Sequence, residues 1–205
     1  MKKGSSTVQF IARTAIGIAL VILAQLIGKM LPAGAVIAGP FSVTQLVTGS
    51  LVNCVLFVFT AQVGILSGVI IGFLSSVLAS LIGIGPAVAA VVPVVGCGNA
   101  ILALIFGLVS GKRHELRAPA VLLAAAVKCG FLWVCVPAVL KALGSVAEKQ
   151  VAALSIMFSW PQGVTALIGG VLALIIIPRL AKVKKESGLK KARSLGLFQL
   201  YLNFG

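Results

Sequence analysis

The chain has few acidic and imidazole side chains. Its 205 residues include no aspartate, one histidine (His114) and three glutamates (Glu115, Glu148 and Glu186). This inventory excludes a paired-carboxylate acid–base site and a two-metal carboxylate site. The phosphate-binding pattern G-x-x-x-x-G-K-[ST] is also missing, so the chain itself is not a P-loop ATPase. We therefore expect a protein that is not an enzyme, with no catalytic residues, no metal and no cofactor.

Polar surface is scarce as well. Hydrophobic residues make up 60% of the chain and charged residues 10%, and the mean hydropathy is +1.19. A soluble domain of this size needs far more polar residues to cover its outside. The composition therefore predicts a polytopic membrane protein. The four cysteines lie in apolar stretches without C-x-x-C spacing, and we expect them to act as small hydrophobic residues.

The apolar runs predict an all-α fold with six transmembrane helices, since each run approaches the roughly 20 residues that a spanning helix needs. The predicted spans are 8–28, 42–61, 64–84, 87–109, 119–142 and 152–178. We expect Pro178 to end the last of them. Residues 1–180 would then form the membrane domain, and residues 181–205 a basic cytoplasmic tail that rests against anionic lipid.

Basic residues are distributed unequally between the two sides. The net charge is +14, and the lysines and arginines flank apolar spans, which indicates membrane orientation rather than nucleic-acid binding. If the N-terminus is inside, the inner side holds the N-terminal tail, the loop "SGKRHELRAP" and the C-terminal tail. The only basic residues on the outer side are then Lys29, Lys141 and Lys149. This excess of positive charge predicts that both termini are cytoplasmic.

An alternative for the first 35 residues stays open. They have a basic start, an apolar stretch from Thr14 to Gly28, and an A-x-A pattern at residues 33–35. These features are also typical of a secretory signal peptide. Cleavage would leave five spans.

Small residues recur four apart on several predicted helices, a spacing that permits close helix contact in membranes. The series Gly64, Gly68, Gly72, Ser76 and Ser80 is expected to pack inside the bundle. The pair Ala15 and Ala19 lies on the first helix, in its cytoplasmic half. We interpret this pair as a face for a partner subunit.

Three polar side chains lie deep in predicted spans, where they are costly and often functional. Lys128 is near the middle of the fifth span. It either binds an anionic or carbonyl group of a ligand, or bonds backbone carbonyls or a nearby asparagine, or reaches the inner surface. For Asn53 we favour a helix–helix hydrogen bond. Asn99 follows two glycines in "PVVGCGNA", and both a ligand contact and a helix contact stay open.

A second polar and aromatic group lies toward the outer side. It consists of Gln45, Trp133, Trp160 and Gln162, and we expect Pro161 to disturb the helix beside it and free backbone groups. Aromatic faces with a few amides suit a flat, polar small molecule. An interfacial aromatic belt is the alternative for the tryptophans.

Together these features resemble the substrate-binding S component of an energy-coupling factor (ECF) vitamin transporter. The resemblance covers residues 8 to about 180. It is carried by "ARTAIGIALVILAQ" with its A-x-x-x-A motif, by "LVTGSLVNCVL" and "GILSGVIIGFLSSVLASLIGIGP", and by "VVPVVGCGNAILALIFGLVSGK".

The resemblance implies a multi-pass protein of the bacterial plasma membrane that binds a vitamin-like molecule near the outer face. Its partners would be a transmembrane coupling subunit and two cytoplasmic ATPases. Ala15 and Ala19 would then contact the coupling subunit. Candidate ligand-binding residues, by position, are Gln45, Asn99, Lys128, Trp133, Trp160 and Gln162.

The absence of a carboxylate within the spans favours a neutral or anionic ligand, with Lys128 as the counter-charge. A facilitator that works without ATPases and a membrane scaffold without a ligand are the alternative functions.

Overall fold

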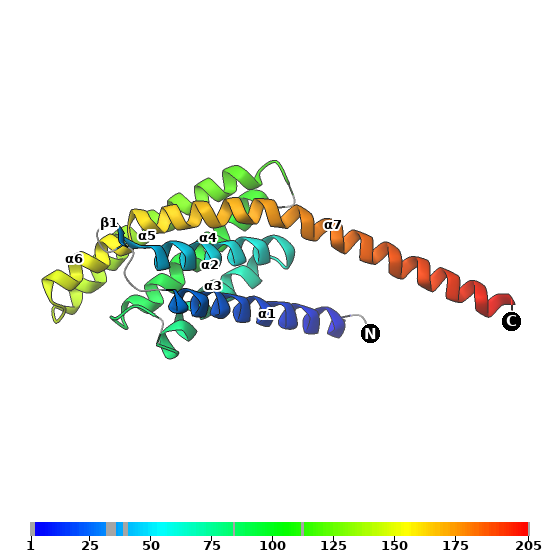
Figure 1. The fold of residues 1–205 in the computed structure, drawn as a ribbon, viewed down its shortest axis with the longest axis horizontal. Coiled ribbons are helices and arrows are strands. Elements are labelled where there is room, and N and C mark those ends of the chain that lie inside the picture. The colour runs from blue at the N-terminus through cyan, green and yellow to red at the C-terminus, as the bar shows by residue number, and fades with distance from the viewer. Residues whose placement is uncertain (1–2, 32–35, 39–40, 84, 112, 205) are drawn as a thin grey trace.

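The computed structural model describes residues 3–31, 36–38, 41–83, 85–111 and 113–204. The described chain is almost entirely helical. The elements are α1 (Lys3–Met30), β1 (Val36–Ala38), β2 (Phe41–Ser42), α2 (Val43–Gln62), α3 (Ile65–Leu81), α4 (Val91–Ser110), α5 (Arg117–Leu143), α6 (Glu148–Met157) and α7 (Trp160–Phe204). The all-α prediction is thus confirmed, and the helices form one elongated bundle (Figure 1).

Five segments are long and apolar enough to cross a membrane: α1 from Ser6, α2, α4, α5, and residues 148–187 of α6 and α7 taken together. The predicted span 64–84 corresponds to α3, which is apolar but has only 17 residues. The start of α1 lies at the end of the bundle from which α7 projects (Figure 1). This arrangement suits the predicted placement of both termini on one side.

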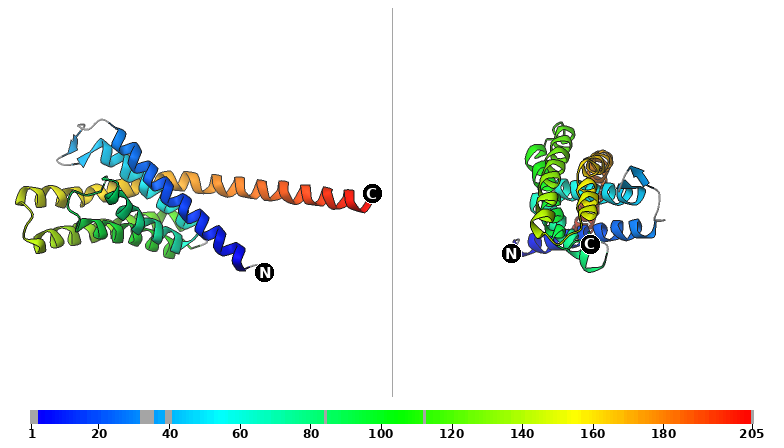
Figure 2. Two further views of the ribbon diagram at one scale, coloured as in Figure 1. Left: turned by 90° about the horizontal axis from the view of Figure 1, so that it is seen from below. Right: turned by 90° about the vertical axis from the view of Figure 1, so that its left-hand side faces the viewer.

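Helix α1 crosses the other helices obliquely on one side of the bundle (Figure 2). It packs on α2 and α3. Its inner face consists of Thr14, Gly17, Val21, Ala24 and Gly28, all of which are buried. Thr14 Oγ1 lies 2.9 Å from Ser67 Oγ of α3, within hydrogen-bond distance. The A-x-A pattern at residues 33–35 lies outside the described residues.

Gly68, Gly72 and Ser76 of the small-residue series are buried inside the bundle, as predicted, whereas Gly64 precedes α3 and Ser80 is only partly buried. A Cβ added at Gly72 would lie 2.9 Å from the backbone carbon of Asn99, so α3 and α4 touch backbone to backbone. A similar approach joins α2 and α7, because a Cβ at Gly169 would lie 2.8 Å from the backbone nitrogen of Cys54. These close approaches bring the short side chains of neighbouring helices within mutual reach.

The sixth predicted span is broken. Helix α6 ends at Met157 and α7 begins at Trp160, with Pro161 in the first turn of α7. Proline has no backbone N–H and fits the first turn of a helix, where that donor has no intrahelical partner. The disturbance predicted at Pro161 is therefore confirmed.

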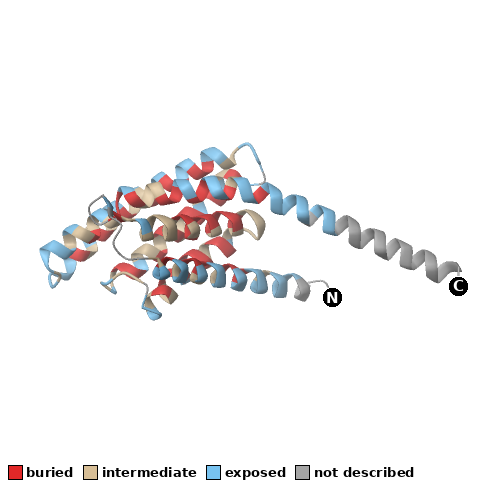
Figure 3. Cartoon of the chain, in the orientation of Figure 1, coloured by how far each residue is buried: buried red, intermediate tan, exposed pale blue. Residues whose placement is uncertain are grey.

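Pro178 does not end a helix, contrary to the prediction. Helix α7 continues through it to Phe204, so the boundary predicted at residue 180 has no break in secondary structure. Pro178 removes one hydrogen bond of the helix, and the remaining bonds continue on both sides. Buried residues gather where the helices meet, whereas α7 is exposed as it leaves the bundle (Figure 3).

Candidate functional site

A buried lysine lies at the centre of the bundle. Lys128 is the twelfth residue of α5, about 16 Å from its start at the helical rise, and its side chain is only 2% exposed. Its ammonium donates hydrogen bonds to Asn53 Oδ1 of α2 and to Asn99 Oδ1 of α4, each at 2.7 Å. The structure thus places Lys128 inside the bundle, bonded to both asparagines, and not at the inner surface.

Each asparagine is oriented by a hydroxyl on a further helix. Asn53 Nδ2 donates to Thr165 Oγ1 of α7 at 3.4 Å, and Asn99 Nδ2 donates to Ser76 Oγ of α3 at 3.2 Å. These bonds turn the amide oxygens toward Lys128. The five side chains form a buried polar network, contributed by α2, α3, α4, α5 and α7.

The network borders a cavity of about 460 Å³, a size typical of small-molecule sites. The cavity lies between the end of α1, the beginnings of α2 and α4, the end of α3 and the break between α6 and α7. Its polar lining residues are Gln25, Lys29, Ser42, Thr44, Gln45, Thr48, Asn53, Ser76, Asn99, Lys128 and Gln162. Four of the predicted ligand-binding residues, Gln45, Asn99, Lys128 and Gln162, therefore come together in one cavity.

The helix break contributes a backbone acceptor to this cavity. The helix is interrupted after Met157, so the backbone carbonyl of Met157 accepts hydrogen bonds from side chains. Gln45 Nε2 donates to it at 2.9 Å and Gln162 Nε2 at 3.4 Å. The two glutamines thereby fasten α2 and α7 to the break.

Several lining oxygens have no partner among the described residues. They are Gln25 Oε1, Gln45 Oε1 and Thr48 Oγ1, which are all buried atoms. A buried polar atom without a hydrogen bond costs about 1–3 kcal/mol. These oxygens therefore leave room for donors on a bound molecule.

The structure does not bring the two tryptophans into the cavity. Trp133 lies on the outer side of α5 and is 62% exposed. Trp160 is 44% exposed and makes an edge-to-face contact with Phe41 at 5.2 Å between ring centres. Neither residue lines the cavity. Their positions fit the interfacial belt better than ligand contact.

The predicted partner face on α1 points away from the bundle. Ala15 and Ala19 are both exposed, on the side opposite the buried residues Gly17 and Val21. The sequence spacing alone did not determine whether this pair faced inward or outward.

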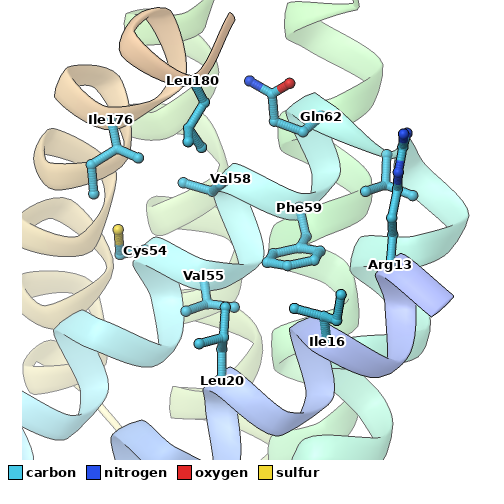
Figure 4. A pocket seen from close by; sticks show the side chains of 11 residues that line it. Arg13, Ile16, Leu20, Cys54, Val55, Val58, Phe59, Gln62, Ile176 and Leu180 are labelled. Atoms are coloured by element: carbon cyan, nitrogen blue, oxygen red, sulfur yellow. The ribbon is translucent and has the colours of Figure 1, made fainter. Parts of the chain in front are cut away.

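An apolar groove of about 510 Å³ lies beside that face, between α1, α2 and α7 (Figure 4). Ile16 and Leu20 of α1 line one wall, and Ile176 of α7 lines the opposite wall. Arg13 and Gln62 lie at one end of it.

Sequence reasoning missed several polar residues of the site, among them Gln25, Thr48 and Thr165. Each is a polar side chain inside an apolar helix, which is the signal that identified Lys128 and Asn99. A systematic reading of every such position would have included them.

No protein-family model, no curated protein and no solved structure matches this chain. The assignment of function therefore depends on the site itself.

Proposed function

We propose that this chain is the substrate-binding subunit of an ATP-driven importer of the ECF type, located in the bacterial plasma membrane. It takes up a water-soluble vitamin or a related small heterocycle through the cavity beside Lys128. Its six spans leave both termini in the cytoplasm. The cavity lies at the end of α1 that is remote from the N-terminus, so it opens toward the outside.

One observation carries this proposal: a cavity of about 460 Å³ is lined by a deeply buried ammonium group and by amides from several helices. Intramembrane charges are rare and generally mark binding or transport sites. The chain lacks a P-loop of its own, so an ATP-driven cycle requires partner subunits.

The outward alanine pair supports a partner on α1. Small side chains allow another membrane helix to approach closely. Ala15 and Ala19 are exposed, and the apolar groove adjoins them. We assign this face to the transmembrane coupling subunit, which in turn holds two cytoplasmic ATPases.

Co-purification tests the proposal. The tagged full-length chain is isolated in mild detergent from its own cells, and native mass spectrometry detects bound subunits and bound small molecules. We expect a coupling subunit, two ATPases and one small molecule. Ala15→Trp and Ala19→Trp should remove the protein partners and leave the small molecule in place, because the bulky ring blocks only the outer face of α1.

Ala126→Trp is the matched control, since Ala126 is an exposed alanine on α5. It should retain all partners. A chain that binds a small molecule but no ATPase would be a stand-alone facilitator instead. A chain that binds neither would be a scaffold.

A further inference from the structure

The ammonium of Lys128 has no anionic partner in the part of the chain that the structure describes. The sequence contains three glutamates, and none of them lines the cavity. The two groups that Lys128 contacts are neutral amide oxygens. A buried charge without a counter-charge is strongly unfavourable, even when it is hydrogen-bonded.

The same ammonium retains bonding capacity on the cavity side. An ammonium group has three N–H donors, and two of them are directed to Asn53 and Asn99. Lys128 itself lines the cavity. A third acceptor within the cavity would complete its hydrogen bonding, and an anionic acceptor would also compensate its charge.

Two of the three other unpaired lining atoms in the described chain are amide oxygens, which only accept hydrogen bonds, and the third is the hydroxyl oxygen of Thr48. Gln25 Oε1 and Gln45 Oε1 belong to side chains that line the cavity, and neither has a partner among the described residues. Gln45 is held in place because its Nε2 already donates to the carbonyl of Met157. Its free oxygen can therefore accept a hydrogen bond from an N–H or O–H group of a ligand.

From these complementary groups, and on the basis of the proposed function, we infer that the ligand is a small organic acid. Its ionised group pairs with Lys128, and an N–H or O–H group of the same molecule donates to Gln25 or Gln45. A cationic ligand is disfavoured because Lys29 and Lys128 both line the cavity and no carboxylate of the described chain does. A neutral ligand would leave the charge of Lys128 uncompensated.

The inference is tested with matched acid and neutral compounds. The full-length protein in nanodiscs of zwitterionic lipid is incubated with an equimolar mixture of seven compounds. Three are acids (nicotinate, pantothenate and biotin), three are their neutral analogues (nicotinamide, panthenol and biotinamide), and thiamine is the cation. Native mass spectrometry identifies the bound species, and it also identifies any molecule that remains bound from the cells. We expect an acid with a hydrogen-bond donor, bound at least tenfold more tightly than its neutral analogue.

Two variants locate the interaction. Lys128→Gln keeps a donor for the asparagine oxygens but removes the charge, and it should weaken binding of the acid at least tenfold while changing that of the neutral analogue less than threefold. Lys141→Gln is the control, because Lys141 is an exposed lysine on the same helix that does not line the cavity. It should leave both affinities unchanged. Thermal unfolding checks that both variants are folded.

The outcomes separate this inference from the proposed function. A bound neutral or cationic molecule overturns the inference, as does an acid whose affinity Lys128→Gln leaves unchanged, and the transport proposal survives both results. If the Lys128 variant fails to fold, the inference is still tested by the unmodified protein, which should bind the acid more tightly than its neutral analogue. A protein that carries nothing from the cells and captures no compound contradicts the proposed function, and the inference fails with it.

Discussion

The ammonium nitrogen of Lys128 lies 2.7 Å from Oδ1 of Asn99, a residue 29 positions earlier on the neighbouring helix α4. The contact depends on the close approach of α3 to α4 at Gly72, since Asn99 is positioned by Ser76 of α3. The packing of α3 against α4 and the hydrogen bond between Lys128 and Asn99 are therefore coupled.

This coupling predicts that Asn99→Leu destabilises the protein. The substitution removes an acceptor from a buried cation, and hydrogen bonds to charged groups contribute about 1.5–3 kcal/mol. We expect the free energy of unfolding in detergent to fall by about that amount. In a Lys128→Met background the same substitution should cost less, because no buried cation is then left without its acceptor. Additive losses would show that the two side chains do not interact.

Gly72→Ala should destabilise the contact between α3 and α4. The added Cβ would lie 2.9–3.1 Å from three backbone atoms of Asn99 and Ala100, which cannot rotate away. Overpacking of this kind costs about 1–3 kcal/mol. Gly130→Ala is the control, because a Cβ there meets nothing within 4 Å and alanine favours the helix by up to about 1 kcal/mol. Thermal unfolding of the two variants should therefore shift in opposite directions.

Gln162→Leu and Trp133→Leu distinguish the cavity from the outer surface. Gln162 lines the cavity and donates to Met157, so its loss should weaken ligand binding several-fold. Trp133 is exposed on the far side of α5, and its replacement should change affinity less than twofold. The bound small molecule, once identified, is titrated against both variants. Equal losses would place the site elsewhere.

Single cysteines should report the orientation in the membrane. In a background without the four native cysteines, Arg113→Cys lies in the loop between α4 and α5 and Ser145→Cys in the link between α5 and α6. A maleimide that does not cross membranes should label Ser145→Cys in intact cells, and Arg113→Cys only after lysis. The reverse pattern would place the termini outside.

The sequence predicted the helical elements well because long apolar runs and their breaks are local signals. The interruption near Pro161 follows from the chemistry of proline alone. The internal role of Gly68 and Gly72 also follows from local spacing. At Pro178 the same rule failed, since a single missing N–H does not stop a helix whose other hydrogen bonds continue.

The site was predictable only in part. Lys128 and Asn99 are conspicuous because buried polar groups are rare, but their mutual contact depends on how two helices rotate relative to each other. Trp133 illustrates the limit. It lies five residues after Lys128, which turns it about 140° around the helix and away from the cavity. The angle was available from the sequence, but the side that faced inward was not.

The outward position of Ala15 and Ala19 has a thermodynamic consequence. An alanine has no rotamers to lose, so docking a helix against this ridge freezes no side-chain motion there. For the proposed partner, binding and dissociation at these two positions would then be governed by contact area and shape, without an ordering penalty from the alanines. An interface of this kind suits a partner that binds and dissociates repeatedly in the proposed transport cycle.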